Sequence, residues 1–586
     1  MKNKPFHITN AVFNGNYPFL DDKYLFDLNE KINRNSSEFA KIFYERLLIK
    51  YDLKNNYFKL FNYSFQKTLS FYIDKYIRFQ KFKDYFFKNY IYNHKSGIRY
   101  ITSPDELDKL SKDHEFIQKN FIFICKFYNK KLNLISNRKK QILEKKLNNN
   151  YLFDIRNKNS FEFLYKRFVS KFFENYSPLQ CLISSDHLAN DFNSFRINNF
   201  FFNVLNNNTF KNLEKKINAK INRSNRNFVF DYDQIKPIDL YQVLNIKIPN
   251  EDIFIKSFLK FCQYYFPIHT FESLIKLDEF IKNYLPNTKK NIFLSTHNGG
   301  YSLFLKNFIA RTKGYKIIRS QHGGYYGYIN YHPEADIEYK DCDYFITWGW
   351  AKKINKIDYP KFVDLPSPWL SERYTYFTNN LDKKNFTEKK RVLFMPSMIK
   401  LFPVFNQMYG TTRYETALSQ CKSIFNIIKL FSNYKINVDI KFYDEISLNY
   451  FKSNFDLELD NIKYKYFKLI DNFDKGLSPK LVSKYDFILF DHPGTGYLEC
   501  LAYKIPTIIV WDKSFSKENQ SSKNEFKKLK RLNLLYEKLD QLKPILKNYS
   551  HFLRKINNPK INDFRSKYIN IDIQWSKKWL SFLNNI

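Results

Sequence analysis

The stretch YDFILFDHPGTGYLECLAYKIPTIIV, residues 485–510, decides the fold. Its apolar run 487–490 has the length and composition of a buried β-strand, and the run 507–510 that follows Pro506 has the same character. The segment between them, GYLECLAYK at 496–504, is helical in pattern. A buried strand, a glycine-containing turn, a helix and a second buried strand predict a parallel sheet that helices cover on both faces.

The same succession recurs through the second half of the chain. Short apolar runs that end in polar or glycine-rich residues lie at 290–296, 315–321, 344–349, 391–397, 436–444, 485–494 and 507–512. A segment with Pro360, Pro366 and Pro368 separates the first three runs from the rest, and we interpret it as a linker. We therefore expect an α/β protein with two Rossmann-like domains that face each other across a cleft.

The first 150 residues have a different pattern. Apolar residues recur at three- and four-residue intervals over 38–51 and 64–82, which predicts amphipathic helices. The segment 103–116 opens with Ser-Pro-Asp-Glu, a typical helix start. The predicted organisation is a mostly helical region at 1–150, a first Rossmann-like domain at 151–375 and a second at 376–586. A final helix at 573–585 is expected to pack back over the first domain.

Charge and cysteine content narrow the class of protein. The 586 residues carry 96 Lys and Arg against 58 Asp and Glu, a formal net charge of +38, which attracts polyanions without choosing among them. The six cysteines form no CxxC pair, so the sequence indicates neither a zinc site nor a disulfide framework. The first residues lack a signal-peptide pattern and the apolar runs are short, so we expect a cytoplasmic protein, with a peripheral contact to the inner membrane as a further hypothesis.

The turn after the strand 487–490 has the residues of a phosphate site. Gly494 and Gly496 allow a ligand to approach the backbone closely, and Thr495 supplies a hydroxyl at a helix start, where free N–H groups attract phosphate. The imidazole of His492 can donate to a phosphate oxygen. Glu499 lies one helical turn beyond Thr495 and could accept the hydroxyls of a ribose or sugar. A glycine-rich turn with a capping threonine and a solvated glutamate remains the alternative.

A second glycine-rich loop follows the run 315–321 and contains Gln321, His322, Gly323, Gly324 and Tyr325. Paired glycines beside a histidine are costly in backbone entropy, so such a loop usually has a use.

Three of the ten histidines, His297, His322 and His332, fall within 36 residues of each other. A histidine can act as a general base near neutral pH. We take His322 as the leading candidate for the catalytic base, with His297 and Glu338 behind it; histidines that only shape the loop are the alternative. No metal site is predicted, because no histidine pair has the spacing of a metal-binding helix.

Arg413 opens the predicted helix 414–434 and could clamp a diphosphate, although a surface role is equally compatible with the sequence.

These motifs resemble a known family. The segments SQHGGYYG at 320–327, DYFITWGW at 343–350, LPSPWL at 365–370 and YLECLAYKIP at 497–506 are similar to transferases of bacterial O-antigen and surface-polysaccharide gene clusters. The resemblance implies a GT-B-like glycosyltransferase with an acceptor-side first domain, a second domain that holds a nucleotide-sugar donor, and no cofactor or essential metal.

Within that resemblance, the pair His492-Pro493 is similar to one found in transferases that use CMP-activated acidic sugars. The family often has Ser or Thr where this chain has Pro493-Gly494, so the phosphate contacts need not be shared.

The expected function is transfer of a sugar from a nucleotide-activated donor to a surface-polysaccharide or lipid-linked glycan acceptor near anionic lipid. Three alternatives stay open. A nucleic-acid-binding protein would explain the charge, but the sequence has none of the RRM, KH, helix-turn-helix or zinc signatures, so no specific nucleic-acid partner is expected. A non-catalytic scaffold of a polysaccharide assembly complex is the second. A sugar epimerase or glycerophosphate transferase on the same fold is the third.

Overall fold

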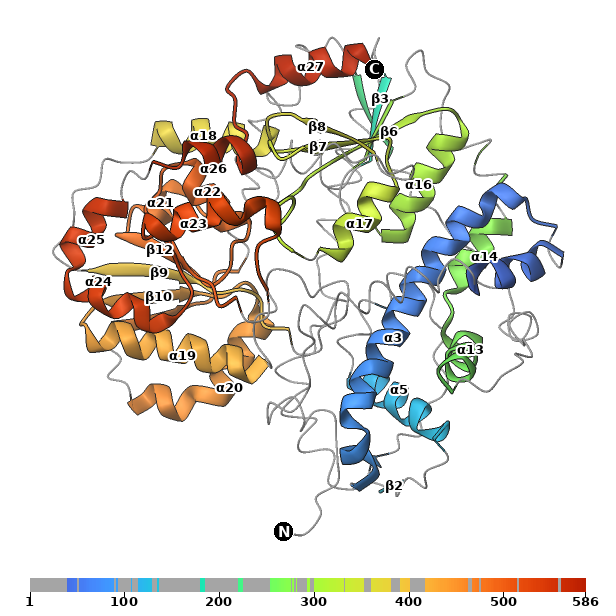
Figure 1. Ribbon diagram of the computed structural model, residues 1–586, viewed down its shortest axis with the longest axis horizontal. Helices are drawn as coiled ribbons and strands as arrows, with labels where there is room; N and C mark the ends of the chain where they lie inside the picture. The colour runs from blue at the N-terminus through green and yellow to red at the C-terminus, as the bar shows by residue number, and fades with distance from the viewer. Residues whose placement is uncertain are drawn as a thin grey trace, which may run out of the picture.

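The computed structural model describes residues 39–49, 52–88, 91–92, 107, 114–128, 134–135, 180–184, 220–224 and, with gaps, 253–281 and 292–586. The gaps in the last range include 296–299, 331, 352–359, 381–389, 401–416 and 462–465. Within the described residues, two parallel sheets form the centres of two α/β parts, and a third part is helical (Figure 1).

The first sheet has six strands, all parallel, in the order β4-β3-β5-β6-β7-β8. Its strands are β3 (Gln180–Ser184), β4 (Lys220–Ser224), β5 (Ile292–Ser295), β6 (Lys316–Ser320), β7 (Tyr344–Thr347) and β8 (Lys361–Asp364). Helices α16 (Gly300–Thr312) and α17 (Pro333–Lys340) connect β5 to β6 and β6 to β7. The parallel strands that the sequence predicts at 290–296, 315–321 and 344–349 are confirmed.

The second sheet also has six parallel strands, in the order β11-β10-β9-β12-β13-β14. Its strands are β9 (Arg391–Met395), β10 (Asn437–Lys441), β11 (Phe467–Ile470), β12 (Phe487–Phe490), β13 (Thr507–Val510) and β14 (Leu535–Tyr536). Its helices include α19 (Ala417–Asn433), α20 (Glu445–Asn461), α22 (Thr495–Ala502) and α23 (Lys523–Arg531). The predicted fold class, a parallel α/β fold with two Rossmann-like sheets and a helical N-terminal region, is confirmed.

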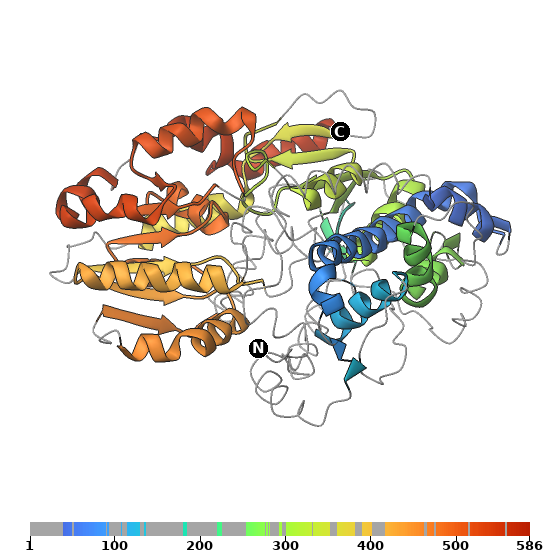
Figure 2. The ribbon, with the colours of Figure 1, turned by 60° about the horizontal axis from the view of Figure 1, so that its bottom comes forward.

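The order of the second sheet contains a topological switch point. From β9 the chain moves outward to β10 and β11, whereas from β12 it moves in the opposite direction to β13 and β14. Because crossovers between parallel strands are right-handed, the two series of helices lie on opposite faces, with α19 and α20 on one and α22 and α23 on the other (Figures 1 and 2). Ligands of such sheets bind outside the carboxyl ends of the strands that flank the switch point, here β9 and β12.

Apolar residues at these positions build the core of the second sheet. All residues of β12 and β13 are buried, as expected for strands covered on both faces. On α19 the buried residues Cys421, Ile424 and Ile428 follow one another at three- and four-residue intervals and face the sheet. Burial of each large aliphatic side chain contributes roughly 1.5–3 kcal/mol, so this stripe anchors α19 beside β10.

The helical part draws on two separated segments of the chain. Helix α3 (Phe58–Lys88) packs against α5 (His114–Lys126), α13 (Ile253–Tyr265) and α14 (Ile268–Ile275), largely through aromatic rings such as Phe61 on Phe266. The predicted helices at 38–51 and 64–82 are confirmed over their described residues, whereas the predicted helix start at 103–116 lies mostly outside them. This part rests on the first sheet's helix α16, where Tyr63 stacks on Phe304 with ring centroids 4.1 Å apart.

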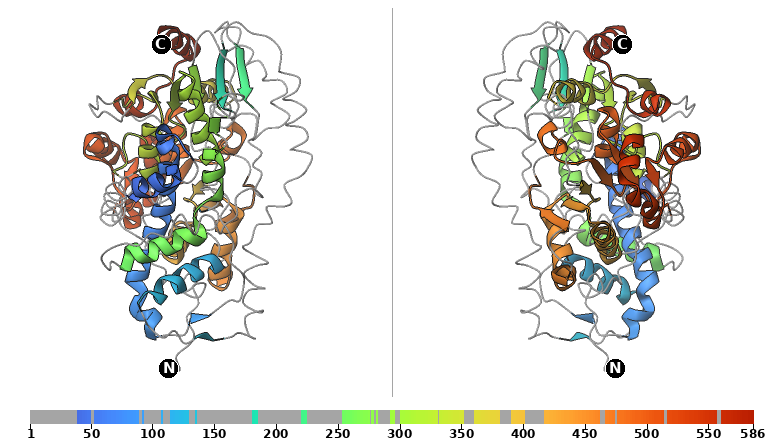
Figure 3. Two further views of the ribbon diagram at one scale, coloured as in Figure 1. Left: turned by 90° about the vertical axis from the view of Figure 1, so that its right-hand side faces the viewer. Right: turned by 90° about the vertical axis from the view of Figure 1, so that its left-hand side faces the viewer.

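The C-terminal segment crosses from the second α/β part to the first. Helix α27 (Trp575–Asn585) packs there through Trp579, whose Nε1 donates to the Pro366 carbonyl at 2.9 Å, and Lys316 Nζ donates to the backbone oxygen of Ile586 at 3.0 Å. The C-terminus consequently lies at the same end of the molecule as β3 (Figures 1 and 3). The expected return of the last helix over the first domain is confirmed.

The proline segment is more ordered than a linker. The prediction missed β8 and the helix α18 (Pro368–Asn380), which begins at Pro368 itself. β8 is short and only partly buried because it forms the edge of its sheet, so it lacks the continuous apolar run that marks the inner strands.

No helix among the described residues is both long and apolar enough to cross a membrane.

Candidate functional site

Two loops from the two sheets meet directly. One follows β6 and runs from residue 321 to 330; the other follows β12 and leads into α22. The backbone N–H of Gly324 donates to Thr495 Oγ1 at 2.9 Å, and Tyr328 Oη donates to the carbonyl of Pro493. A Cβ at position 324 would lie 2.9 Å from both Gly494 C and Thr495 N, so only glycine permits this approach. The two clusters that the sequence singles out are therefore one structural unit.

A third segment, residues 516–522, holds the first loop in place. Its backbone pairs with the loop: Asn330 N donates to Lys517 O at 2.9 Å and Asn519 N donates to Tyr328 O at 2.8 Å. The side-chain amide of Asn519 also donates to Gly327 O at 2.9 Å. Because backbone groups of the loop are satisfied by the second domain, the loop conformation depends on contact between the domains.

His492 lies at the switch point of the second sheet. Its Nδ1 is 2.7 Å from Asp491 Oδ1, and the buried Asp491 also accepts the backbone N–H of Ser397 at 2.7 Å and the Ser397 hydroxyl at 3.1 Å. Ser397 follows β9, and Gln420 of α19 donates to its hydroxyl at 2.9 Å. Asp491 thus joins the carboxyl ends of β9 and β12 and holds His492 by Nδ1, with 17% of the imidazole side chain exposed.

This pairing sets the proton positions of His492. An ionised carboxylate only accepts, so Nδ1 carries a proton whether the ring is neutral or charged. The protonated ring then donates from Nε2 as well, which is the form that would stabilise an anionic phosphate.

His322 is held by a different chain of hydrogen bonds. Its Nδ1 is 2.7 Å from Tyr326 Oη, and Tyr326 Oη donates to Glu338 Oε2 at 2.7 Å. Tyr326 is 1% exposed and Glu338 is 3% exposed, so the hydrogen bond between them lies in the protein interior. The structure therefore brings two of the three candidate catalytic residues, His322 and Glu338, into one chain of hydrogen bonds.

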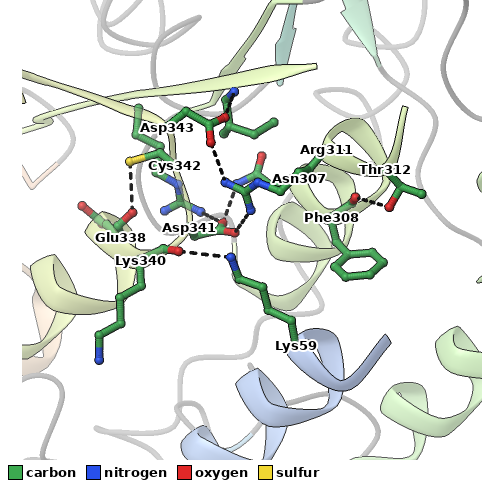
Figure 4. A network of polar contacts seen from close by, with 12 residues as sticks. Lys59, Asn307, Phe308, Arg311, Thr312, Glu338, Lys340, Asp341, Cys342 and Asp343 are labelled. Carbon is green, nitrogen blue, oxygen red and sulfur yellow. Dashed lines mark hydrogen bonds and ion pairs between the residues drawn. The ribbon is translucent and has the colours of Figure 1, made fainter. Parts of the chain in front are cut away.

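An ionic network whose central pair, Arg319 and Asp341, is buried lies beside this chain of hydrogen bonds (Figure 4). Asp341, which follows α17, pairs with Arg319 of β6 and accepts from Asn307 Nδ2 of α16 at 2.6 Å. Asp343 accepts the backbone N–H of Ile317 at 2.7 Å. These contacts fix α17, and with it Glu338, against the strand that ends at the loop.

Gln321 shapes the first loop. Its side chain is fully buried; Nε2 donates to Gly323 O at 2.8 Å, and Oε1 accepts from Trp350 Nε1 at 2.6 Å and from Trp348 N at 3.2 Å. All of these partners lie in the first domain, so Gln321 stabilises the start of the loop and the segment after β7. A Cβ on Gly323 would lie 2.8 Å from Thr495 Oγ1, so a side chain there would displace the Thr495 hydroxyl.

Tyr325 reaches from the first domain to His492. Its backbone has φ +74°, a left-handed conformation that is uncommon outside glycine and that is found at functional sites and tight turns. The ring stacks on the His492 imidazole, with centroids 6.3 Å apart and planes inclined by 24°. A Cβ on Gly494 would lie 2.6 Å from His492 Nε2 and 3.0 Å from Tyr325 Oη, so a side chain there would push both rings away.

Glu499 is occupied by an ion pair. Its Oε2 is 3.0 Å from Arg373 Nη2 of α18, which also donates to the carbonyl of Leu477 at 2.7 Å. Both side chains are nearly buried, and the rings of Trp369 and Phe377 flank the guanidinium at 5.2 and 5.3 Å. Burial raises the pKa of Glu499, and the charge of Arg373 opposes that rise.

His297 and Arg413 lie outside the described residues. Sequence reasoning missed Tyr326, Ser397 and Arg373, whose roles arise from contacts between distant segments; the spacing of His322 and Tyr326 in one loop was the one signal that could have indicated such a pair. Among the residues that the structure describes, no three His, Cys, Asp or Glu side chains form a group that could hold a metal ion.

Solved structures with a related arrangement share little sequence with this chain. The UDP-GlcNAc 2-epimerase of Methanocaldococcus jannaschii, in complex with UDP-GlcNAc and UDP, is 10% identical, with a TM-score of 0.36 over 70% of this chain and 100% of that one. A glycosyltransferase from Rickettsia africae is 11% identical, with a TM-score of 0.35 over 70% and 99%. MurG from Acinetobacter baumannii is 8% identical, with a TM-score of 0.34 over 70% and 100%.

No curated protein matches the chain. The model of the LIC12162 family transferases matches residues 16–542, which include both loops and both sheets. The chain is a member of the LIC12162 transferase family.

Proposed function

We propose that this transferase moves a glycosyl group from a nucleotide-activated donor to a glycan or lipid-linked acceptor. The observation that carries the proposal is the placement of His492 and Asp491 at the switch point of the second sheet, in contact with the loop that carries His322. Sheets of this kind bind ligands at that point, and the two histidines come from opposite domains. Such a site can hold a donor on one side and an acceptor on the other.

His322 would act as the base. A neutral ring that donates from Nδ1 to Tyr326 carries its lone pair on Nε2, the atom that would take the proton of the acceptor hydroxyl. The acceptor oxygen would then form a bond to the anomeric carbon of the donor while the bond from that carbon to the phosphate oxygen breaks. The donor phosphate would leave with the electron pair.

His492 would stabilise the departing phosphate. The protonated imidazole is one donor, and the N–H groups at the start of α22, at Thr495 and Gly496, are the others. Gly324 lies against Thr495 N, so a phosphate at that N–H would require the two loops to separate. The proposal gives no role to a metal ion, and the resemblance of the His492-Pro493 pair favours a CMP-activated acidic sugar as donor.

Glu499 and Arg413 complete the proposed donor site. Glu499 would offer its remaining carboxylate oxygen to a ribose or sugar hydroxyl while Arg373 holds the other. Arg413, outside the described residues, stays a candidate clamp for the phosphates. The formal net charge of +38 supports a contact with the anionic inner membrane, where lipid-linked acceptors of surface polysaccharides would be met.

Nucleotide release tests the proposal. The purified chain is incubated with CMP-, UDP- and GDP-activated sugars and a lipid extract as acceptor source, and free nucleotide is followed by mass spectrometry. We expect release from one nucleotide class, with a rate that falls at least about 100-fold in His322→Ala, because a positioned base contributes 10²–10⁴-fold. The exposed His551 provides the control variant His551→Ala, which should keep the full rate. Equal rates in all three proteins would contradict the proposed site.

A further inference from the structure

Tyr326 is the buried middle residue of the hydrogen-bonded chain that joins Glu338 to His322. Its hydroxyl contacts the imidazole Nδ1 and the Glu338 carboxylate, both at 2.7 Å, from a ring that is 1% exposed. A tyrosine hydroxyl has one proton, and in this geometry it points to the carboxylate. The oxygen can then only accept from His322, which places a proton on Nδ1.

From this geometry we infer that Tyr326 is a positioning residue that couples the charge of Glu338 to His322 and fixes the tautomer in which Nε2 is the basic nitrogen. The inference rests on the proposed function for its consequence in catalysis, but the coupling itself is a property of the protein without substrate. When His322 takes up a proton at Nε2, Nδ1 keeps its own, and the polarised hydroxyl stabilises the imidazolium.

Charged and titratable groups of the first domain lie around Glu338 and Tyr326. Arg319 lies near enough to interact with Glu338 electrostatically, although its direct partner is Asp341. The ring of His332 packs on Tyr326 at 4.6 Å, and His332 Nδ1 accepts from Ala335 N at 3.3 Å as the cap of α17.

From the second domain, His492, which is hydrogen-bonded to Asp491, stacks on Tyr325, and Lys517 and Glu518 lie in the segment that pairs with the end of the loop at residues 329–330. Among these groups, Glu338 is the carboxylate that a hydrogen-bonded hydroxyl links to His322.

The coupling predicts how readily His322 takes up a proton. A hydrogen bond to a charged group is stronger than one between neutral groups, so Glu338 and Tyr326 together favour the protonated ring. In Tyr326→Phe or Glu338→Gln the ring should lose its proton at a lower pH, by about 0.5–1 pH unit. A role of Tyr326 in packing alone would leave this midpoint unchanged.

Diethyl pyrocarbonate measures the midpoint without any substrate, because it modifies the unprotonated imidazole. The rate of modification of the peptide that contains His322 is followed by mass spectrometry between pH 5 and 8 in the wild type, Tyr326→Phe and Glu338→Gln. The exposed His551 serves as the internal reference. The matched control is Tyr536→Phe, which removes a buried hydroxyl that has no hydrogen-bond partner within the described part of the chain.

We expect the midpoint for His322 to fall in both test variants and to stay in Tyr536→Phe, with His551 unchanged throughout. An unchanged or raised midpoint in either folded variant overturns the inference; if Tyr326→Phe does not fold, Glu338→Gln decides alone. Because the assay needs no donor, failure of the proposed glycosyl transfer would appear separately, as an absence of nucleotide release. Where turnover is measurable, both variants should lower kcat and leave the KM for the donor unchanged.

Discussion

Replacing Gly324 by alanine should destabilise the contact between the two domains. The new Cβ would lie 2.8 Å from Tyr328 Oη, 2.9 Å from Gly494 C and 2.9 Å from Thr495 N. Two of these three atoms are backbone atoms of the other domain, so no rotation of a flexible side chain can relieve them. Crowding of this kind costs about 1–3 kcal/mol in well-packed regions.

Gly476 provides a matched control. An added Cβ there would meet nothing within 4 Å, and the residue is exposed, so Gly476→Ala should change the free energy of unfolding by less than about 0.5 kcal/mol. Urea unfolding of both variants, followed by tryptophan fluorescence, measures the difference. Trp348 and Trp350 contact Gln321 at the start of the loop and report on its surroundings. Identical unfolding of the two variants would refute the inferred backbone contact between the domains.

Two further predictions concern the same unit. Arg373→Met should cost about 3–5 kcal/mol at pH 8, because it leaves Glu499 buried without its cation. Burial raises the pKa of Glu499 and the charge of Arg373 opposes that rise, so the Glu499 carboxyl of the variant takes up a proton more readily. The loss in the free energy of unfolding should therefore shrink from pH 8 toward pH 5. Urea unfolding that shows an equal loss at both pH values would contradict this account. Tyr328→Phe removes two hydrogen bonds of the Tyr328 hydroxyl, the one to the Pro493 carbonyl and the one from Tyr325 N. Their loss should speed amide hydrogen exchange over residues 321–330. Exchange at the wild-type rate would show that these hydrogen bonds do not hold the loop.

The inner strands were predictable because burial on both faces requires continuous apolar runs. Residues 487–490 and 507–510 became β12 and β13 at the expected positions. Edge strands were not predictable in the same way. β14 has two residues and β8 is half exposed, so neither has an apolar run that stands out from a loop.

The site was predictable in part. Glycines followed by a helix after a buried strand indicated the turn 491–496, and the structure places it at the switch point. The contact between Gly324 and Thr495 joins residues 171 positions apart, and no local pattern carries that information. The same reason hid the partner of Glu499, because the ion pair with Arg373 depends on how α18 crosses α22.

The histidines show where local reasoning reaches its limit. The sequence placed His322 and Glu338 sixteen residues apart as alternative bases, whereas the structure joins them through Tyr326. A loop sequence gives the residue types that chemistry needs, but which nitrogen of His322 carries a proton depends on a carboxylate from α17.

Binding of nucleotides at His492 is the most direct test of the proposed donor site. Isothermal titration calorimetry with CMP, UDP and GDP would compare the wild type, His492→Ala and the exposed control His551→Ala. We predict that one nucleotide binds the wild type and the control equally, and that His492→Ala weakens its Kd at least tenfold, as the loss of a charge-assisted hydrogen bond to phosphate requires. Equally weak binding of all three nucleotides to the wild type and to His492→Ala would contradict the donor site.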